Sequence, residues 1–299
     1  MKPLLTQGEN SVLEVAKAVC DVTETTPFAK MRIADVVRIE GSGISDDLYR
    51  YALSAHFDVL IAKHNKAFLA IEFDGAGHAP ANDAKKALLC DRFGIPMVRV
   101  TEKHLDAKQF GDTAVGFFIW QLFCVDAFLA EYGSDSYERY DPYFFASIPG
   151  KSRNWPFAYS ERWRARLERP FRAAADKFDS SVRDFYAHGI LQFGTIFSTF
   201  HKGLECCSVY AQRVGRDQII FGEAELAVEI HGLAQRRFEL FGEIATFTEG
   251  LAAEKMYRQG MAFLEGNCAP TSEEYIRLKS REWKANGFKL SKALNVKPW

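Results

Sequence analysis

Residues 56–100 read HFDVLIAKHNKAFLAIEFDGAGHAPANDAKKALLCDRFGIPMVRV and decide the fold of the first part of the chain. Two predominantly apolar runs, 56–62 and 67–74, are typical of β-strands. The polar residues 64–66 between them are typical of a turn. We therefore predict a β-hairpin at the start of this stretch.

The rest of the stretch predicts a helix followed by another strand. Apolar residues over 82–93 recur at helical spacing, and Gly94 ends the pattern. Residues 95–100 form a further apolar run of strand composition. The order strand, strand, helix, strand indicates an α/β domain with a small mixed sheet.

Three segments precede this stretch. Apolar spacing over 9–20 predicts a helix, with Asn10 or Ser11 as its N-terminal cap. Residues 31–39 have the composition of a strand or a short extended segment. Residues 46–54 are more polar and predict a loop or a single helical turn.

Three carboxylates lie near the ends of the predicted hairpin strands. Glu72 and Asp74 are two residues apart, so they project to the same side of their strand, and Asp58 on the neighbouring strand can reach that side. Like charges a few ångströms apart repel, and a hard cation such as Mg²⁺ relieves the repulsion. The pattern predicts a metal site, although acidic residues on adjacent strands can also simply be solvated.

The same stretch resembles the PD-(D/E)XK nuclease superfamily, and more narrowly its bacterial branch related to very-short-patch-repair endonucleases. The positions that match the pattern of that branch are Asp58, Glu72, Asp74, Gly75, His78, Asp83, Lys86, Leu89, Gly94, Pro96 and Arg99. The resemblance covers about residues 10–105. It implies a restriction-endonuclease-like fold for that part of the chain and carries no information on the remainder.

The resemblance also implies a centre for Mg²⁺ or Mn²⁺. By analogy with the family, Asp58 and Glu72 would be the first and second metal ligands, and the Phe73 carbonyl would complete the set. Glu14, on the predicted first helix, matches an acidic residue that approaches the metal in related proteins.

The chain departs from the superfamily at the third motif position, where Asp74 stands in place of a lysine; the related branch shares this aspartate. The resemblance gives Asp74 and His78 assisting roles at the active site; the alternative for His78 is a loop histidine hydrogen-bonded to backbone. Lys86 is our candidate for the displaced lysine, to orient water or neutralise phosphate charge. A solvated helix lysine is the alternative, and Lys85 is its neighbouring competitor.

Charge and composition limit how the chain could bind nucleic acid. The 299 residues carry 38 Lys and Arg against 39 Asp and Glu, a net charge of −1, so nucleic-acid binding needs a local basic patch. Residues 151–172 interleave basic and aromatic side chains, which suits phosphate contact and base stacking. The candidate contacts are Arg153, Trp155, Arg162, Trp163 and Arg166. A solvated helix surface is the alternative.

The remaining sequence suggests two domains. We predict a nuclease-like domain over 1–110 and a mostly helical α+β accessory region over 111–299, with a role in binding substrate or a partner. In that region we expect helices over 114–131 and 249–264, and strands within 204–231 around a turn.

The six cysteines include no CxxC pair, and the N-terminus does not resemble a signal peptide. We therefore expect free thiols and a cytoplasmic protein. The most apolar run, 116–130, is too short to cross a membrane, so we expect no membrane partner.

Together these features predict a Mg²⁺-dependent endonuclease that hydrolyses phosphodiester bonds, with DNA as the expected substrate. A place in bacterial defence against phage or other foreign DNA follows from family analogy alone. The alternative is a catalytically weak module of nuclease fold that binds nucleic acid or a partner protein. Either is compatible with a homo-oligomer or a partner subunit.

Overall fold

The computed structural model describes residues 3–75, 80–109, 112–133, 190–200, 203–214, 218–232, 237–285 and 289–290. The chain divides into two compact units. Unit 1 is built mainly from Met1–Asp126 and Val228–Leu240, and unit 2 holds most of the remaining residues. Unit 1 thus extends past residue 110, because it includes most of helix α6 (Ala114–Tyr132) and the end of strand β9 (Gln218–His231).

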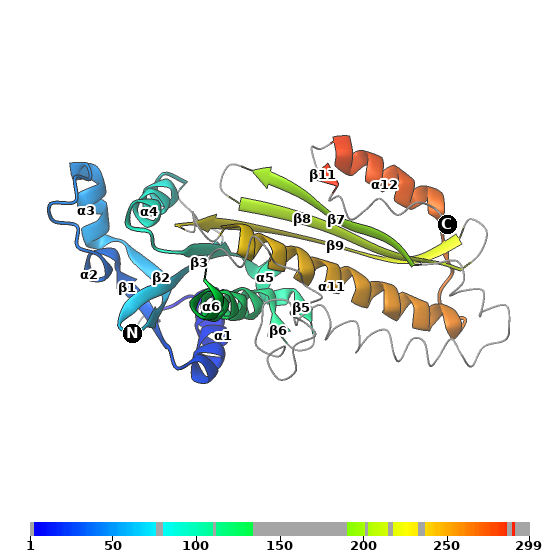
Figure 1. The fold of residues 1–299 in the computed structure, drawn as a ribbon, viewed down its shortest axis with the longest axis horizontal. Coiled ribbons are helices and arrows are strands. Elements are labelled where there is room, and N and C mark those ends of the chain that lie inside the picture. Colours follow the sequence, from blue (N-terminus) through cyan, green and yellow to red (C-terminus); the bar gives the residue numbers. More distant parts are fainter. Residues whose placement is uncertain are drawn as a thin grey trace. The chain divides into compact units, whose positions relative to one another are not determined.

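Unit 1 contains a mixed sheet (Figure 1). Its strands lie in the order β1 (Thr26–Arg32), β2 (His56–Lys63), β3 (Lys66–Phe73) and β4 (Met97–Val100), followed by the end of β9. β1, β2 and β3 pair antiparallel, β3 and β4 pair parallel, and β4 and β9 pair antiparallel. The α/β prediction with a mixed sheet is confirmed.

The predicted hairpin is formed by β2 and β3, and the backbone conformation of two residues explains its turn. His64 and Asn65 have φ of 51° and 60°, which is the left-handed region required at both central residues of a type I′ turn. Lys63 pairs with Lys66 on either side of it. The register shifts between Ile61 and Ala62, so one residue of β3 bulges out of the ladder.

The helices of unit 1 are α1 (Gln7–Thr23), α2 (Ile33–Val36), α3 (Asp46–Ser54), α4 (Pro80–Phe93), α5 (Glu102–Asp106) and α6, and a small separate hairpin joins β5 (Lys108–Gln109) to β6 (Asp112–Thr113). α4 and β4 confirm the predictions over 82–93 and 95–100. At the end of α4, Gly94 has φ of 66°, the left-handed conformation in which glycine terminates helices.

Helix α1 begins earlier than predicted. Its cap is Thr6, not Asn10 or Ser11: the Thr6 hydroxyl accepts from the Glu9 N–H at 3.3 Å, and the Glu9 carboxylate accepts from the Thr6 N–H at 2.8 Å. This reciprocal pair is a capping box, which satisfies two backbone donors at once. The prediction gave weight to the apolar spacing and overlooked the Thr–x–x–Glu pattern before it.

Two further segments differ from the prediction. Residues 31–39 were expected to be extended, but β1 ends at Arg32 and the short helix α2 follows. Residues 46–54 were expected to be a loop or a single turn, but they form the nine-residue helix α3. The Ser45 hydroxyl caps α3 by accepting from the Leu48 N–H, and Ala52 is its buried anchor.

The core of unit 1 forms on both sides of the sheet. On one side Leu60, Ala70 and Met97 pack against Ala87 and Cys90 of α4. Helix α1 packs against β1, β2 and β3, and Figure 1 shows it across the sheet from α4. Side chains alternate along a strand. Asp58 is two residues before Leu60 and Glu72 is two residues after Ala70, so both start on the side of the sheet that faces α4.

Unit 2 contains β7 (Ile190–Phe200), most of β8 (Gly203–Arg213), the first part of β9, β10 (Thr271–Ser272), most of α11 (Arg237–Leu264), α12 (Glu273–Ala285) and β11 (Lys289–Leu290). Strands over 204–231 are confirmed, β7 was not predicted, and α11 is longer than the expected 249–264. Helix α11 packs closely on β9, since a side chain at Gly222 would place its Cβ 2.0 Å from the Ala252 carbonyl oxygen.

None of the helices in the described residues is both long and apolar enough to cross a membrane. All six cysteines are free thiols, and five of them are buried.

Candidate functional site

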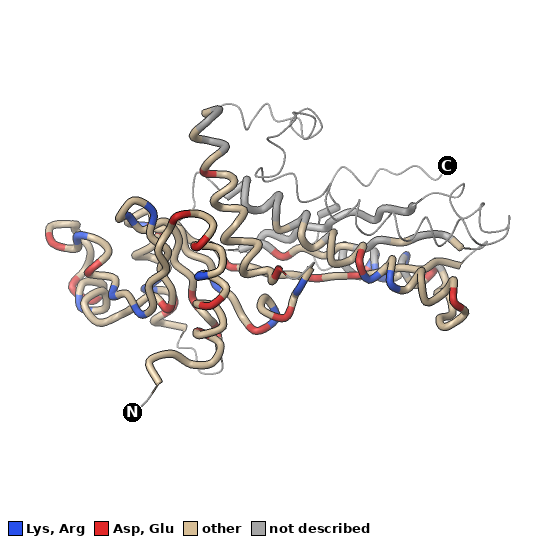
Figure 2. Tube along the Cα trace, turned by 90° about the horizontal axis from the view of Figure 1, so that it is seen from below, with Lys and Arg blue, Asp and Glu red and all other residues tan. Residues whose placement is uncertain are grey.

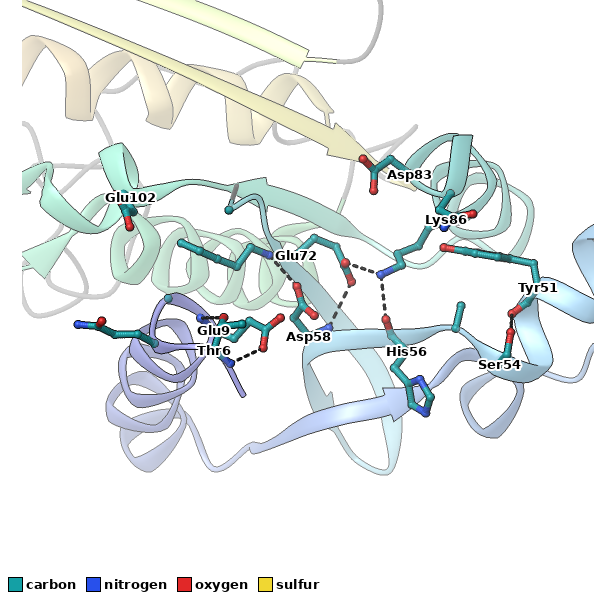
Figure 3. Close-up of a pocket in the computed structure, with 16 residues that line it drawn as sticks. Thr6, Glu9, Tyr51, Ser54, His56, Asp58, Glu72, Asp83, Lys86 and Glu102 are labelled. Atoms are coloured by element: carbon teal, nitrogen blue, oxygen red, sulfur yellow. Dashed lines mark hydrogen bonds and ion pairs between the residues drawn. The ribbon is translucent and has the colours of Figure 1, made fainter. Parts of the chain in front are cut away.

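Unit 1 contains a pocket of about 830 Å³ (Figure 3). It is lined by the starts of α1, β2, α4 and α5 and by the ends of α3 and β3. The acidic residues in its lining are Glu9, Asp58, Glu72, Asp83 and Glu102. Among the lining residues, only Lys86 is a lysine or arginine. The pocket therefore joins residues that the sequence spreads over nearly a hundred positions.

Asp58 and Glu72 lie where the ladder between β2 and β3 ends. The last ladder pair on this side is Val59 with Ile71. Beyond it the Asp58 N–H donates to Glu72 Oε1 at 3.3 Å, and the Phe73 N–H donates to Asp58 Oδ2 at 2.9 Å. The two carboxylates take the place of backbone acceptors, so the predicted pair does converge, and both side chains are buried.

Lys86 reaches this pair from α4, as Figure 3 shows. Its ammonium donates to Glu72 Oε2 and to the His56 carbonyl oxygen, the latter at 2.8 Å. Its neighbour Lys85 instead pairs with Asp47 at 2.8 Å and lies over the Tyr51 ring. The structure thus brings Lys86, and not Lys85, to the predicted position.

A second lysine, which the sequence analysis did not identify, lies on the other side of Asp58. Lys30 of β1 places its ammonium 2.6 Å from Asp58 Oδ1 and 2.9 Å from Glu9 Oε1. Pairing between β1 and β2 sets Lys30 opposite Asp58, between the pairs Ala29–Val59 and Met31–Phe57. We call Asp58, Glu72, Lys30 and Lys86 the lysine cluster.

The first helix contributes Glu9 to the pocket, which corrects the expectation for Glu14. The Glu14 side chain is 59% exposed and pairs with Lys17 on the same helix at 2.8 Å. Glu9 reaches the pocket because the start of α1 lies directly on β3: a Cβ at Gly8 would be 2.1 Å from the Phe73 ring. The capping pattern at the helix start was the signal that could have drawn attention to Glu9.

Asp74 lies in a different set of contacts and is not among the pocket-lining residues. Arg99 grips it with Nε and an Nη at 2.9 and 2.6 Å, and the same guanidinium lies 3.0 Å from Asp83. We call Arg99, Asp74 and Asp83 the arginine cluster. Asp74 and Glu72 leave the same strand end, but their charges are balanced by different partners.

Burial and ion pairing together set the pKa values of the pocket residues. Loss of solvent raises the pKa of Glu72 to about 7; Asp58 adds to the increase and Lys86 opposes it. Burial lowers the pKa of Lys30, but hydrogen bonds with Asp58 and Glu9 outweigh this, and its pKa is raised. Burial, together with Glu72 and Asp83, raises the pKa of Tyr51 to about 12.

Tyr51 is a further pocket residue that the sequence analysis missed. It lies on α3, and Figure 3 shows its ring at the pocket wall beside Lys86. We expected a loop or a single turn over 46–54, and such a segment has no defined side on which Tyr51 could be placed. With its raised pKa, Tyr51 keeps its phenolic proton and remains a hydrogen-bond donor at neutral pH.

The donor set suits a hard cation. Mg²⁺ binds proteins through one or two carboxylates and retains several waters, and Asp58 and Glu72 supply two adjacent carboxylates at the pocket wall. The Lys30 ammonium already binds Asp58, so this carboxylate has a cation beside it. No group of three or more His, Cys, Asp or Glu side chains in the described ranges is arranged to hold a metal. The four-ligand set with Glu14 is therefore not assembled.

The other predicted site residues lie outside the described residues. They are His78, Arg153, Trp155, Arg162, Trp163 and Arg166. Elsewhere, acidic and basic residues are interspersed along the described trace of unit 1 (Figure 2).

Residues 1–113 match the model of a family described as a protein of unknown function, DUF2726. This range covers every described residue of the pocket lining and of both charge clusters. Comparisons of the chain with curated proteins and with solved structures gave no match.

Proposed function

We propose that the chain is a nuclease that hydrolyses phosphodiester bonds in DNA with Mg²⁺ or Mn²⁺ as cofactor. The observation that carries the proposal is the convergence of Asp58, Glu72 and Lys86 at the wall of one pocket. The resemblance of residues 56–100 to the PD-(D/E)XK superfamily supports the same chemistry.

In this proposal Asp58 and Glu72 would hold the cation through their carboxylates. A divalent cation bound there would supply an activated water and stabilise the charge that develops on the phosphate. Lys86 favours the ionised form of Glu72 and directs a positive charge toward the pocket. Tyr51, which remains protonated, donates a hydrogen bond to a phosphate oxygen.

The charge of the pocket explains why the activity would depend on a metal. Its lining carries five carboxylates, which Lys30, Lys86 and Arg99 offset only in part. A bound cation would reduce the repulsion of an anionic phosphodiester by the excess negative charge. DNA as the substrate and a role against foreign DNA rest on the family resemblance.

A second candidate function is a binding module of nuclease fold without strong catalysis. The observation in its favour is that Lys30 and Lys86 already balance Asp58 and Glu72. Such a module would recognise nucleic acid or a partner protein without a metal.

A cleavage assay separates the two functions. Plasmid, linear DNA, single-stranded DNA and RNA are incubated with the protein in Mg²⁺, Mn²⁺ or EDTA. We expect metal-dependent cutting of DNA that is lost in Glu72→Ala and retained in the matched control Glu14→Ala, since Glu14 lies outside the pocket. Absence of cutting by the wild type with either metal contradicts the nuclease and favours the binding module.

A further inference from the structure

Lys30 differs from every other residue of β1 in its backbone. Its φ is 53°, in the left-handed region that lysine rarely adopts. The other non-glycine residues with positive φ in the described parts of the chain are Glu24, at the C-terminal cap of α1, and His64 and Asn65, in the hairpin turn. Lys30 alone among these lies inside a strand, so local turn geometry does not account for its conformation.

The Lys30 ammonium makes two ionic contacts. They join two elements that are distant in sequence: Glu9 at the start of α1 and Asp58 on β2. Strained backbone persists where surrounding contacts hold it, and such positions concentrate at functional sites. Here the strained residue presents a positive charge to the carboxylate that is the proposed first metal ligand.

Lys30 and a divalent cation compete for the same oxygen. The ammonium lies 2.6 Å from Asp58 Oδ1, and the other oxygen of Asp58 accepts from the Phe73 N–H. Two cations cannot share one carboxylate oxygen at such a distance without strong repulsion. The Lys30 side chain is 34% exposed, which gives its ammonium a route into solvent.

We propose that Lys30 is an internal counter-ion that occupies the cation position on Asp58 in the metal-free protein and leaves it when a divalent cation binds. This inference rests on the proposed function, because it takes Asp58 as a metal ligand. Lys30 is thus a residue that sets metal affinity. Lys86 remains in place, since it is only 10% exposed and is also held by the His56 carbonyl.

The first test follows Lys30 in the wild-type protein. An amine-acylating reagent is applied for short times with and without Mn²⁺, and the modification of each lysine is read by mass spectrometry. We expect acylation of Lys30 to become at least threefold faster with Mn²⁺, because the ammonium is released from Asp58. Lys17, which pairs with Glu14 on the surface of α1, is the internal control and should not change.

The second test removes the competitor. Lys30→Gly suits the left-handed backbone, so the variant keeps the strand conformation without the ammonium. In calorimetric titration with Mn²⁺, we expect Lys30→Gly to bind about tenfold more tightly than the wild type, because no ion pair has to be broken. Lys17→Ala is the matched control and should bind like the wild type.

The outcomes separate the two levels of the proposal. If the wild type binds Mn²⁺ but neither Lys30 acylation nor the affinity of Lys30→Gly changes, the counter-ion role is wrong and the metal centre stands. If neither the wild type nor Lys30→Gly binds Mn²⁺ at millimolar concentrations, the metal centre and the counter-ion role fail together.

Discussion

The lysine cluster and the arginine cluster lie side by side at the end of β3 and balance charge in opposite ways. In the arginine cluster one guanidinium, 4% exposed, serves two carboxylates and grips one of them through two nitrogens. In the lysine cluster each carboxylate has its own ammonium, and both carboxylates line a pocket.

The difference follows from the chemistry of the two side chains. A guanidinium is planar, always charged, and fits a carboxylate as a fork, whereas an ammonium is a point charge on a flexible stem. The arginine cluster is therefore suited to hold β3, β4 and α4 together. The lysine cluster is suited to exchange one of its cations for another.

The largest effect should come from breaking the arginine cluster. Arg99→Met leaves Asp74 and Asp83 without their shared guanidinium, and we expect it to lower the free energy of unfolding by about 3 to 5 kcal/mol. Urea denaturation measures the change. Arg32→Met is the matched control, because Arg32 grips Asp35 with the same fork on the surface, at 3.0 and 2.6 Å.

The control should leave stability nearly unchanged, since exposed ion pairs contribute little. If Arg99→Met were as mild as Arg32→Met, the arginine cluster would not have the structural role assigned to it.

The next effect is the pH dependence that Glu72 confers on the metal-free protein. Its pKa is about 7 in the folded protein and 4.5 ordinarily, so between these values the folded state binds more protons than the unfolded state. The free energy of unfolding should therefore fall as pH rises from 4.5 to 7, by about 3 kcal/mol in the limit.

The glutamine in Glu72→Gln cannot titrate, so this variant should not lose stability as Glu72 ionises. Relative to the wild type, its free energy of unfolding should therefore rise as pH increases from 4.5 to 7. Urea denaturation of both proteins at pH 5, 6, 7 and 8 measures this difference. A constant difference across the series would show that Glu72 does not ionise with a raised pKa.

A smaller effect on stability should distinguish two neighbouring lysines. Lys86→Met leaves Glu72 without its ammonium, and we expect a loss of about 2 kcal/mol, limited because Glu72 can take up a proton. Lys85→Met breaks a surface pair with Asp47 and should cost less than about 1 kcal/mol. Cleavage activity should fall in Lys86→Met alone; equal loss in both variants would argue against a specific role for Lys86.

The smallest effect is expected for Lys30→Gly in the absence of metal. The variant loses contacts to Glu9 and Asp58 but relieves the left-handed backbone of a non-glycine residue. These changes oppose one another, so the free energy of unfolding should shift by less than about 1 kcal/mol. Thermal unfolding in EDTA checks this, and a loss like that of Arg99→Met would make Lys30 a structural residue.

Local sequence signals were sufficient to predict the centre of unit 1. The hairpin depends on the turn residues His64 and Asn65, and α4 depends on helical spacing and Gly94. The convergence of Asp58 and Glu72 followed from strand alternation within that hairpin. Lys86 was a candidate because of the family resemblance, and its ammonium contacts Glu72 from the helix that follows the same hairpin.

The missing parts of the site come from long-range packing. Lys30 meets both Glu9 and Asp58 only because α1 lies against β3 and β1 pairs with β2 in one register. Neither the register nor the position of the helix start can be read from apolar spacing. Glu14 had the right chemistry and the right helix, but it lies on the exposed side of α1.

The most direct test of the central claim is the metal dependence of thermal unfolding in the wild type and in Asp58→Asn, an almost isosteric variant. We predict that Mg²⁺ or Mn²⁺ stabilises the wild type, by about 2.7 kcal/mol at a metal concentration one hundred times the Kd. Asp58→Asn should show little or no such gain. The absence of stabilisation in the wild type, or an equal gain in both proteins, would contradict a cation site at Asp58 and Glu72.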